Sequence, residues 1–225
     1  MFTLKKLGTV HNSFKEKFGI PRQSGLNEIR SVISFEPEFA NPDAFKGLEE
    51  FSHLWVIWQF SENLRDEFSP TVRPPRLGGN KRIGVFATRS SFRPNSLALS
   101  SVKIEGITFD KDKGPLITVT GLDCMDGTPV FDIKPYITYT DSHPDAICGF
   151  VDKTEMVPLK VEISKAMTDI LGDRISNELI SVLREDPRPR YKKDGDKEFA
   201  ITFDSFNIIF KVNDGTAIVI SVEKI

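Results

Sequence analysis

Short runs of alternating apolar and polar residues are the feature that most restricts the fold of this 225-residue chain. Alternation with a period of two places one face of a run in a core and the other in water, as in an antiparallel strand. Gly, Pro, Asn and Asp residues separate the runs, and no helical pattern of similar length interrupts them. The runs cover residues 3–10, 31–35, 54–60, 83–87, 97–104 and 116–121. They predict a mainly antiparallel barrel or sandwich over about the first 150 residues.

The pattern changes after Phe150. Residues 157–163 predict one more strand, and an apolar stripe from Lys165 to Arg184 predicts a helix that Asp186-Pro187 ends. Alternation returns at 199–204, 206–212 and 217–222, with Asn213-Asp214-Gly215 as a hairpin turn. We therefore divide the chain into a β domain at 1–151 and a small α+β domain at 152–225.

Composition indicates a soluble protein of the cytoplasm. Hydrophobic residues make up 39% and charged residues 28%, no apolar stretch is long enough to span a bilayer, and no secretion signal opens the chain. The two cysteines, Cys124 and Cys148, lack the neighbouring thiols or histidines that a metal site needs. We expect two reduced thiols that pack, and no metal.

Charge is distributed unevenly along the chain. The net charge of −2 argues against a general polyanion binder, but residues 68–104 contain no Asp or Glu. This acid-free stretch contains Arg73, Arg76, Lys81, Arg82, Arg89, Arg93 and Lys103. Proline beside several of these arginines stiffens their turns, so that a guanidinium loses less entropy on binding. The stretch either pairs with distant acids or faces an anion, and the stiff turns favour the anion.

Neither a Gly-x-Gly-x-x-Gly loop after a strand nor a Walker-type loop is present, so a bound cofactor needs another architecture. Several blocks are too specialised for simple connections. They are Pro21-Arg22-Gln23, Phe51-Ser52-His53-Leu54-Trp55, Arg73-Pro74-Pro75-Arg76-Leu77-Gly78-Gly79, Ala87-Thr88-Arg89-Ser90-Ser91-Phe92-Arg93-Pro94-Asn95, Asp126-Gly127-Thr128-Pro129 and Asp132-Ile133-Lys134-Pro135-Tyr136.

Three other readings of single features remain open. A lone histidine such as His53 at the start of an apolar strand is more often a packing residue than a catalyst. Asp132, Lys134 and Tyr136 share one face of a strand, either as a surface ion pair or as a substrate site. The basic loop at 187–197 is either solvated or in contact with RNA.

Taken in order, the blocks resemble the TsaA-like family, tRNA methyltransferase O. The resemblance covers about residues 4–145 and extends more weakly through Asp186-Pro187-Arg188-Pro189. One departure is Ser91, where the family usually has proline, which affects the rigidity of that turn but not its charges.

The resemblance implies a small antiparallel β-barrel enzyme, usually a homodimer, that binds S-adenosylmethionine in loops. It methylates N6 of threonylcarbamoyladenosine beside the tRNA anticodon. The implied cofactor residues are Pro21, Arg22, Gln23, His53, Leu54, Arg89, Leu99, Asp126, Gly127, Thr128 and Pro129.

The same resemblance frames the expected chemistry. Asp132 and Tyr136 are the candidates to accept the N6 proton. The expected substrate contacts are Arg73, Arg76, Arg93, Asn95, Lys134 and Arg188. A tRNA- or nucleotide-binding module without catalysis is the main alternative. An anion-binding hydrolase is weaker, because no nucleophilic arrangement of serine, cysteine and histidine stands out.

Overall fold

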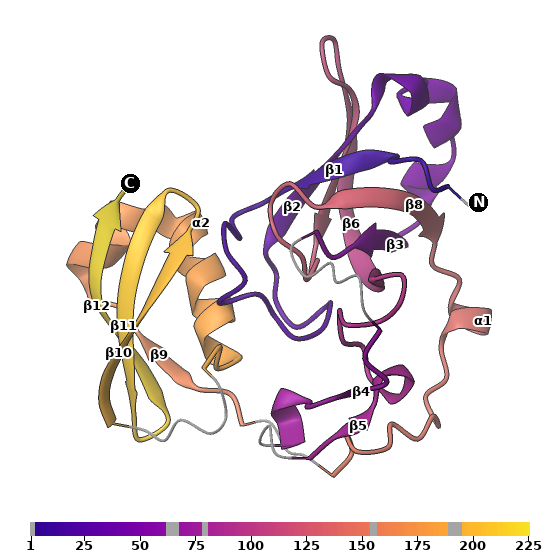
Figure 1. Cartoon of the computed structure of the whole chain (residues 1–225). Helices are drawn as coiled ribbons and strands as arrows, with labels where there is room; N and C mark the ends of the chain where they lie inside the picture. Colours follow the sequence, from indigo (N-terminus) through magenta and orange to yellow (C-terminus); the bar gives the residue numbers. More distant parts are fainter. Residues whose placement is uncertain (1–2, 62–67, 78–80, 154–156, 189–194) are drawn as a thin grey trace.

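The computed structural model describes residues 3–61, 68–77, 81–153, 157–188 and 195–225. Six antiparallel strands close into a barrel in the order β1-β2-β7-β6-β3-β8 (Figure 1). Their bounds are β1 Gly8–His11, β2 Arg30–Phe35, β3 His53–Gln59, β6 Leu97–Asp110, β7 Gly114–Thr120 and β8 Pro129–Pro135. The prediction of a mainly β fold with an antiparallel barrel is confirmed.

Strand β3 illustrates how the alternation produces the barrel. Leu54, Val56 and Trp58 are buried, whereas Trp55 and Ile57 between them are only partly buried. Pairing with β6 places Val56 opposite Ser100 and Trp58 opposite Ala98. A shift of one residue would turn the apolar side chains outward, so burial fixes the register.

The barrel interior is filled by aliphatic side chains from all six strands and from the loops that cap it. Phe45, from the connection between β2 and β3, closes one end of the barrel by packing edge-on against Phe35 at 4.7 Å between ring centroids. The interior is therefore a packed core, and a ligand site has to lie in the loops or on the outer face.

The second part of the chain is a sheet in the order β10-β11-β12-β9, covered by one helix (Figure 1). Its elements are β9 Lys160–Glu162, α2 Lys165–Arg184, β10 Gly195–Phe203, β11 Phe206–Asn213 and β12 Thr216–Lys224. Helix α2 has the predicted bounds, begins at the Ser164 cap and breaks at Gly172, which has a positive φ of 75°. The domain division at residue 151 stays a prediction.

Two strand predictions need correction. The run at 83–87 is a strand only at Ile83–Gly84, because the chain turns into a short 3-10 helix at Val85 and never joins the barrel. The first strand begins at Gly8 and not at Thr3.

The remaining short elements lie in the connections. They are β4 Thr71–Val72, β5 Ile83–Gly84, α1 Thr138–Asp141 and the 3-10 helices Pro37–Phe39, Pro42–Phe45, Leu48–Glu50, Pro75–Leu77 and Val85–Ala87. Within the described residues, no helix is long and apolar enough to cross a membrane.

The segment between β1 and β2, residues 12–29, joins the two parts. Phe14 and Ile29 are buried in the core of the second part, although they belong to the first. Phe14 forms a β-bridge to Phe203, with ring centroids 5.8 Å apart. The Ser13 hydroxyl donates to the buried Glu178 carboxylate at 3.0 Å. The segment is thus held by contacts on both sides.

We expect Phe14→Ala to lower the free energy of unfolding by about 3–5 kcal/mol, because it leaves a cavity in the second core. Phe86→Ala, at a ring that is 71% exposed, should change it by less than about 0.5 kcal/mol. Urea titration followed by circular dichroism measures both. Equal effects would mean that Phe14 does not join the parts as described.

Candidate active site

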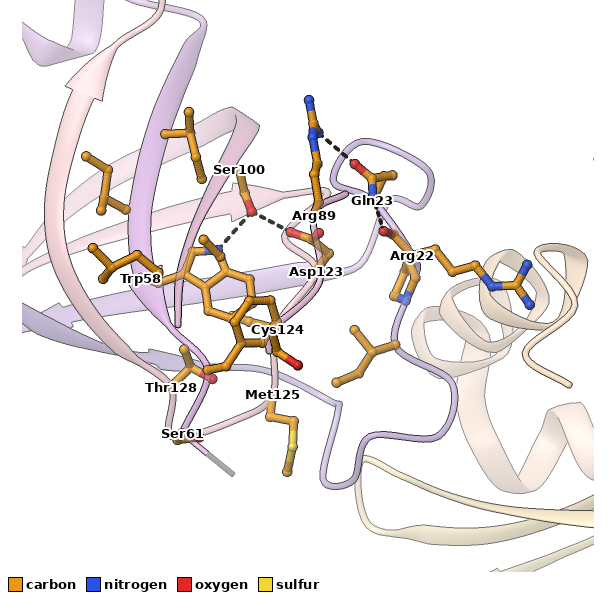
Figure 2. Close-up of a pocket in the computed structure, with 18 of the residues that line it drawn as sticks. Arg22, Gln23, Trp58, Ser61, Arg89, Ser100, Asp123, Cys124, Met125 and Thr128 are labelled. Carbon is orange, nitrogen blue, oxygen red and sulfur yellow. Dashed lines mark hydrogen bonds between the residues drawn. The ribbon is translucent and has the colours of Figure 1, made fainter. Parts of the chain in front are cut away.

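A pocket of about 620 Å³ lies against β3 and β6, between the segment 17–23 and the loop that follows β7 (Figure 2). This volume is in the range of small-molecule sites. Its polar and charged lining residues are Lys17, Arg22, Gln23, Ser61, Arg89, Ser91, Arg93, Ser100, Asp123 and Thr128. Aromatic walls come from Trp55, Trp58 and Phe60. The pocket therefore combines apolar surface with several cations.

A chain of hydrogen bonds reaches this pocket from the barrel core (Figure 2). Trp58 Nε1 donates to Ser100 Oγ at 2.8 Å, and Ser100 Oγ donates to Asp123 Oδ1 at 2.5 Å. Trp58 and Ser100 are almost fully buried. Burial raises the pKa of Asp123, while the Ser100 hydrogen bond and the nearby Arg89 charge oppose that rise.

The Pro21-Arg22-Gln23 loop forms the opposite wall. Gln23 Oε1 accepts a hydrogen bond from Arg89 Nη1 at 2.6 Å, which joins two blocks that are 66 residues apart. Arg22 Nη2 donates to the carbonyl oxygens of Asp186 and Arg188, at 3.4 and 3.2 Å. The second part of the chain therefore positions a wall of the pocket.

The Asp126-Gly127-Thr128-Pro129 turn packs against β1. The Asp126 carboxylate accepts from the Asn12 backbone N–H at 3.0 Å and from Lys15 Nζ at 2.9 Å. Gly127 has a φ of 78°, which favours glycine. Thr128 is buried and lines the pocket, whereas Asp126, Gly127 and Pro129 are not among its lining residues.

The structure thus gathers part of the predicted site. Of the expected cofactor residues, Pro21, Arg22, Gln23, Arg89, Leu99 and Thr128 line the pocket, as does the expected substrate residue Arg93. Arg93 Nη1 donates to the Thr88 carbonyl at 3.0 Å, which ties its turn together. Leu54 points into the barrel core, and His53 is exposed with Nδ1 2.8 Å from Ser52 Oγ.

The two proposed proton acceptors lie outside the pocket lining. Asp132 Oδ2 pairs with Lys134 Nζ at 2.8 Å on the surface of β8. Tyr136, just past the end of β8, lies beside Trp55 at 5.5 Å between ring centroids. Their predicted roles remain untested predictions.

The other expected substrate residues are dispersed. Arg73 and Asn95 are exposed outside the pocket lining, and the side chain of Arg76 lies outside what the structure describes. Arg188 is only 6% exposed and binds Asp186 through two hydrogen bonds of 2.8 and 3.0 Å. This burial favours a structural role for its side chain. Of the basic loop at 187–197, residues 189–194 also fall outside the described part.

Sequence reasoning missed Trp58, Ser100 and Asp123. Trp58 and Ser100 lie in predicted strands at positions that the alternation assigns to the core. Nothing in the sequence therefore distinguishes them from residues that only pack. Asp123 did carry a signal, because it is an acid between the buried residues Leu122 and Cys124. A carboxylate in such a position needs a partner or a ligand.

Within the described residues, no group of three or more His, Cys, Asp or Glu side chains is placed to hold a metal ion. Cys124 is buried, as expected of a packing thiol, but Cys148 is exposed, so the prediction that both thiols pack is wrong for Cys148; neither forms a disulfide. Burial raises the pKa of the Cys124 thiol, so this residue packs as a neutral group.

The chain belongs to the tRNA-methyltransferase O family. The model of the tRNA-methyltransferase O N-terminal domain matches residues 9–142, and that of the C-terminal domain matches residues 156–225. The tRNA (adenine(37)-N6)-methyltransferase of Escherichia coli is 37% identical over 222 residues, which cover 95% of this chain and 94% of that protein. The human protein of the same name is 36% identical over 175 residues, which cover 75% of this chain and 38% of that protein.

Solved structures agree with this assignment. The crystal structure of TrmO from Pseudomonas aeruginosa superposes with a TM-score of 0.80 at 27% identity and covers 99% of this chain and 98% of that one. The similarity therefore extends over both parts of the fold.

We expect Arg89→Ala to weaken binding of a ligand that carries a carboxylate by about 1.5–3 kcal/mol, the range for a hydrogen bond to a charged group. The probe is S-adenosylhomocysteine, measured by calorimetry. Arg82→Ala is the matched control, because Arg82 belongs to the same acid-free stretch but hydrogen-bonds to Thr71 outside the pocket lining. Equal losses in both variants would exclude a specific contact by Arg89.

Proposed function

We propose that this protein transfers a methyl group from S-adenosylmethionine to N6 of the adenosine at position 37 of tRNA, and that its substrate is threonylcarbamoyladenosine. The observation that carries the proposal is the pocket. It brings Pro21-Arg22-Gln23, Arg89, Leu99 and Thr128, which are distant in sequence, to one cavity of suitable volume. The named relatives in the family are tRNA (adenine(37)-N6)-methyltransferases.

The residues of the pocket suit S-adenosylmethionine. That molecule has a carboxylate, an ammonium group, an adenine ring and a sulfonium-bound methyl group, and when bound it supplies the electrophilic methyl carbon. Arg89 is a guanidinium donor for a carboxylate, Gln23 offers an amide, and Trp55 and Phe60 offer apolar walls. Such positioning is the main contribution a protein makes to an in-line transfer.

The same pocket supports the choice of a substrate with a carboxylate. Arg93 lines it in addition to Arg89, so the pocket has a second guanidinium that can contact another anionic group. Threonylcarbamoyladenosine differs from adenosine by a carboxylate-bearing substituent at N6. An arginine held for that carboxylate would be left unpaired by plain adenosine, which would therefore be rejected.

The surface beside the pocket suits a single-stranded tRNA loop. The β4–β5 hairpin belongs to the acid-free stretch and exposes Arg73, Lys81 and Arg82. Phe68 and Phe86 are 53% and 71% exposed there, and their rings stack at 6.1 Å between centroids. In single-stranded RNA, the phosphates bind cationic side chains and the unstacked bases stack on exposed aromatic rings. This surface offers both.

The oligomeric state and the cellular location of the protein are part of the proposal. The outer face of β3 and β6 carries Trp55, Ile57 and the 52% exposed Leu99. We propose that this face, whose three residues also line the pocket, meets a second copy of the chain in a homodimer next to the bound cofactor. We also propose that the protein acts in the cytoplasm, because the named relatives act on tRNA.

We expect methyl transfer to tRNA that carries threonylcarbamoyladenosine and none to tRNA from cells that lack this modification. Mass spectrometry of the digested tRNA measures the product. Arg93→Ala should slow only the reaction of the modified tRNA. Equal methylation of both tRNAs would contradict the proposed substrate, and binding of tRNA without any transfer would favour the non-catalytic alternative.

We also expect Phe86→Ala to weaken binding of a modified anticodon stem-loop by about 1–3 kcal/mol, the value for loss of one stacked base. Phe86→Trp should keep the affinity, because it keeps an aromatic face. Phe109→Ala, at an exposed ring of β6 outside the acid-free stretch, is the control. Fluorescence anisotropy measures all four proteins, and unchanged binding by Phe86→Ala would exclude stacking there.

A further inference from the structure

The pocket contains a single acidic side chain among its described lining residues, that of Asp123. The charged groups that accompany it are the cations Lys17, Arg22, Arg89 and Arg93. Methyl transfer to N6 leaves a proton on that nitrogen, which has to go to a base. Protonated lysine and arginine can only donate hydrogen bonds, so they cannot receive it.

The hydrogen bonds behind Asp123 have a fixed direction. An indole N–H can donate but not accept, so Ser100 Oγ must accept from Trp58. The Ser100 hydroxyl then has its own proton available for Asp123. Trp58 and Ser100 are 2% and 1% exposed, so water does not compete for these contacts. One carboxylate oxygen of Asp123 is therefore held from behind, and the carboxylate is oriented relative to the pocket.

The surroundings of Asp123 balance two opposing effects. Burial favours the neutral acid and raises the pKa of Asp123, whereas the Ser100 hydroxyl and the charge of Arg89 favour the carboxylate. Cys124, the adjacent residue, has a pKa raised by burial and contributes a neutral thiol. A carboxyl group whose pKa lies above its ordinary value is a stronger base once it is ionised, which suits general-base catalysis.

The acceptors suggested by the sequence lack this placement. Asp132 is bound to Lys134 at 2.8 Å, with 44% of its side chain exposed, on the surface of β8. Tyr136 lies beside Trp55, which lines the pocket, but is not itself among the lining residues. Neither one is held by a buried donor in the way that Asp123 is.

We propose that Asp123 is the catalytic residue that accepts the N6 proton of the substrate, and that Trp58 and Ser100 are its positioning residues. This inference rests on the proposed function. In the step, the N6 lone pair forms the new nitrogen–carbon bond while the carbon–sulfur bond breaks and leaves its electron pair on sulfur. The N6 proton passes to the Asp123 carboxylate, which later releases it to water.

The test compares Asp123→Asn with the wild-type protein in single-turnover methylation of modified tRNA between about pH 4 and pH 9, a range that begins near the ordinary pKa of a carboxyl group. The wild-type rate should rise with pH until Asp123 is ionised and then become constant. Asparagine is isosteric but cannot take a proton, so the rate should fall by about 10²–10⁴-fold and lose this pH dependence. Calorimetry with S-adenosylhomocysteine should give an affinity within a factor of about three of wild type, well below the loss that follows removal of a charged contact.

Ser100→Ala is the second variant, and it tests positioning separately from folding. The Ser100 hydrogen bond favours the carboxylate, so its removal should raise the pKa of Asp123 further. The part of the rate–pH curve in which the rate rises with pH, its rising limb, should then move to higher pH. A purely structural role for Ser100 would lower the rate without moving the limb. Thermal unfolding followed by circular dichroism establishes that both variants are folded.

Three results would overturn the assignment. The first is a rising limb that survives in Asp123→Asn. The second is the loss of S-adenosylhomocysteine binding in that variant, which would make Asp123 a cofactor ligand. The third is removal of the limb by Asp132→Asn instead. If the wild-type protein transfers no methyl group to modified tRNA, the proposed function fails first, which is a different outcome from any of these three.

Discussion

The burial of Phe14 in the core of the second part is the contact on which the pocket depends. It fixes one end of the segment between β1 and β2, and Ile29 fixes the other. Between these anchors the chain forms one wall of the pocket with Pro21, Arg22 and Gln23. The pocket is therefore assembled by packing far from it, and the two cores act together on one wall.

Much of the fold was predictable from the sequence, because the residues that a strand or helix buries are apolar and recur with the period of that element. The alternation of β3 and the apolar stripe of α2 each match an element of the structure. The prediction of a strand over residues 83–87 was wrong, because the buried Val85 belongs to a 3-10 helix and not to a strand. Alternation indicates which side chains are buried. Over only five residues, however, it does not distinguish a strand from a short 3-10 helix.

The site was predictable only in part, and for a different reason. The family motifs indicate Gln23 and Arg89, but only the tertiary structure shows that they hydrogen-bond to each other across 66 residues. Asp132 lies at the centre of β8, and Asp123 lies in the loop that follows β7. Asp132 forms an ion pair with Lys134, two residues further along the same strand. Asp123 is instead oriented by Ser100 of β6, which is itself bound to Trp58 of β3. Such partners come from strand register, which local patterns do not contain.

The grip on Arg22 also bears on how this protein can diverge. Its guanidinium binds main-chain carbonyl oxygens at positions 186 and 188, and every amino acid offers such an oxygen. The link between the two parts can therefore persist while the side chains at one of its ends drift. Only the backbone path is constrained, through the left-handed conformation of Asp186 at a φ of 46°, which Asp, Asn and Gly tolerate best. A coupling of this kind leaves almost no trace in a comparison of sequences.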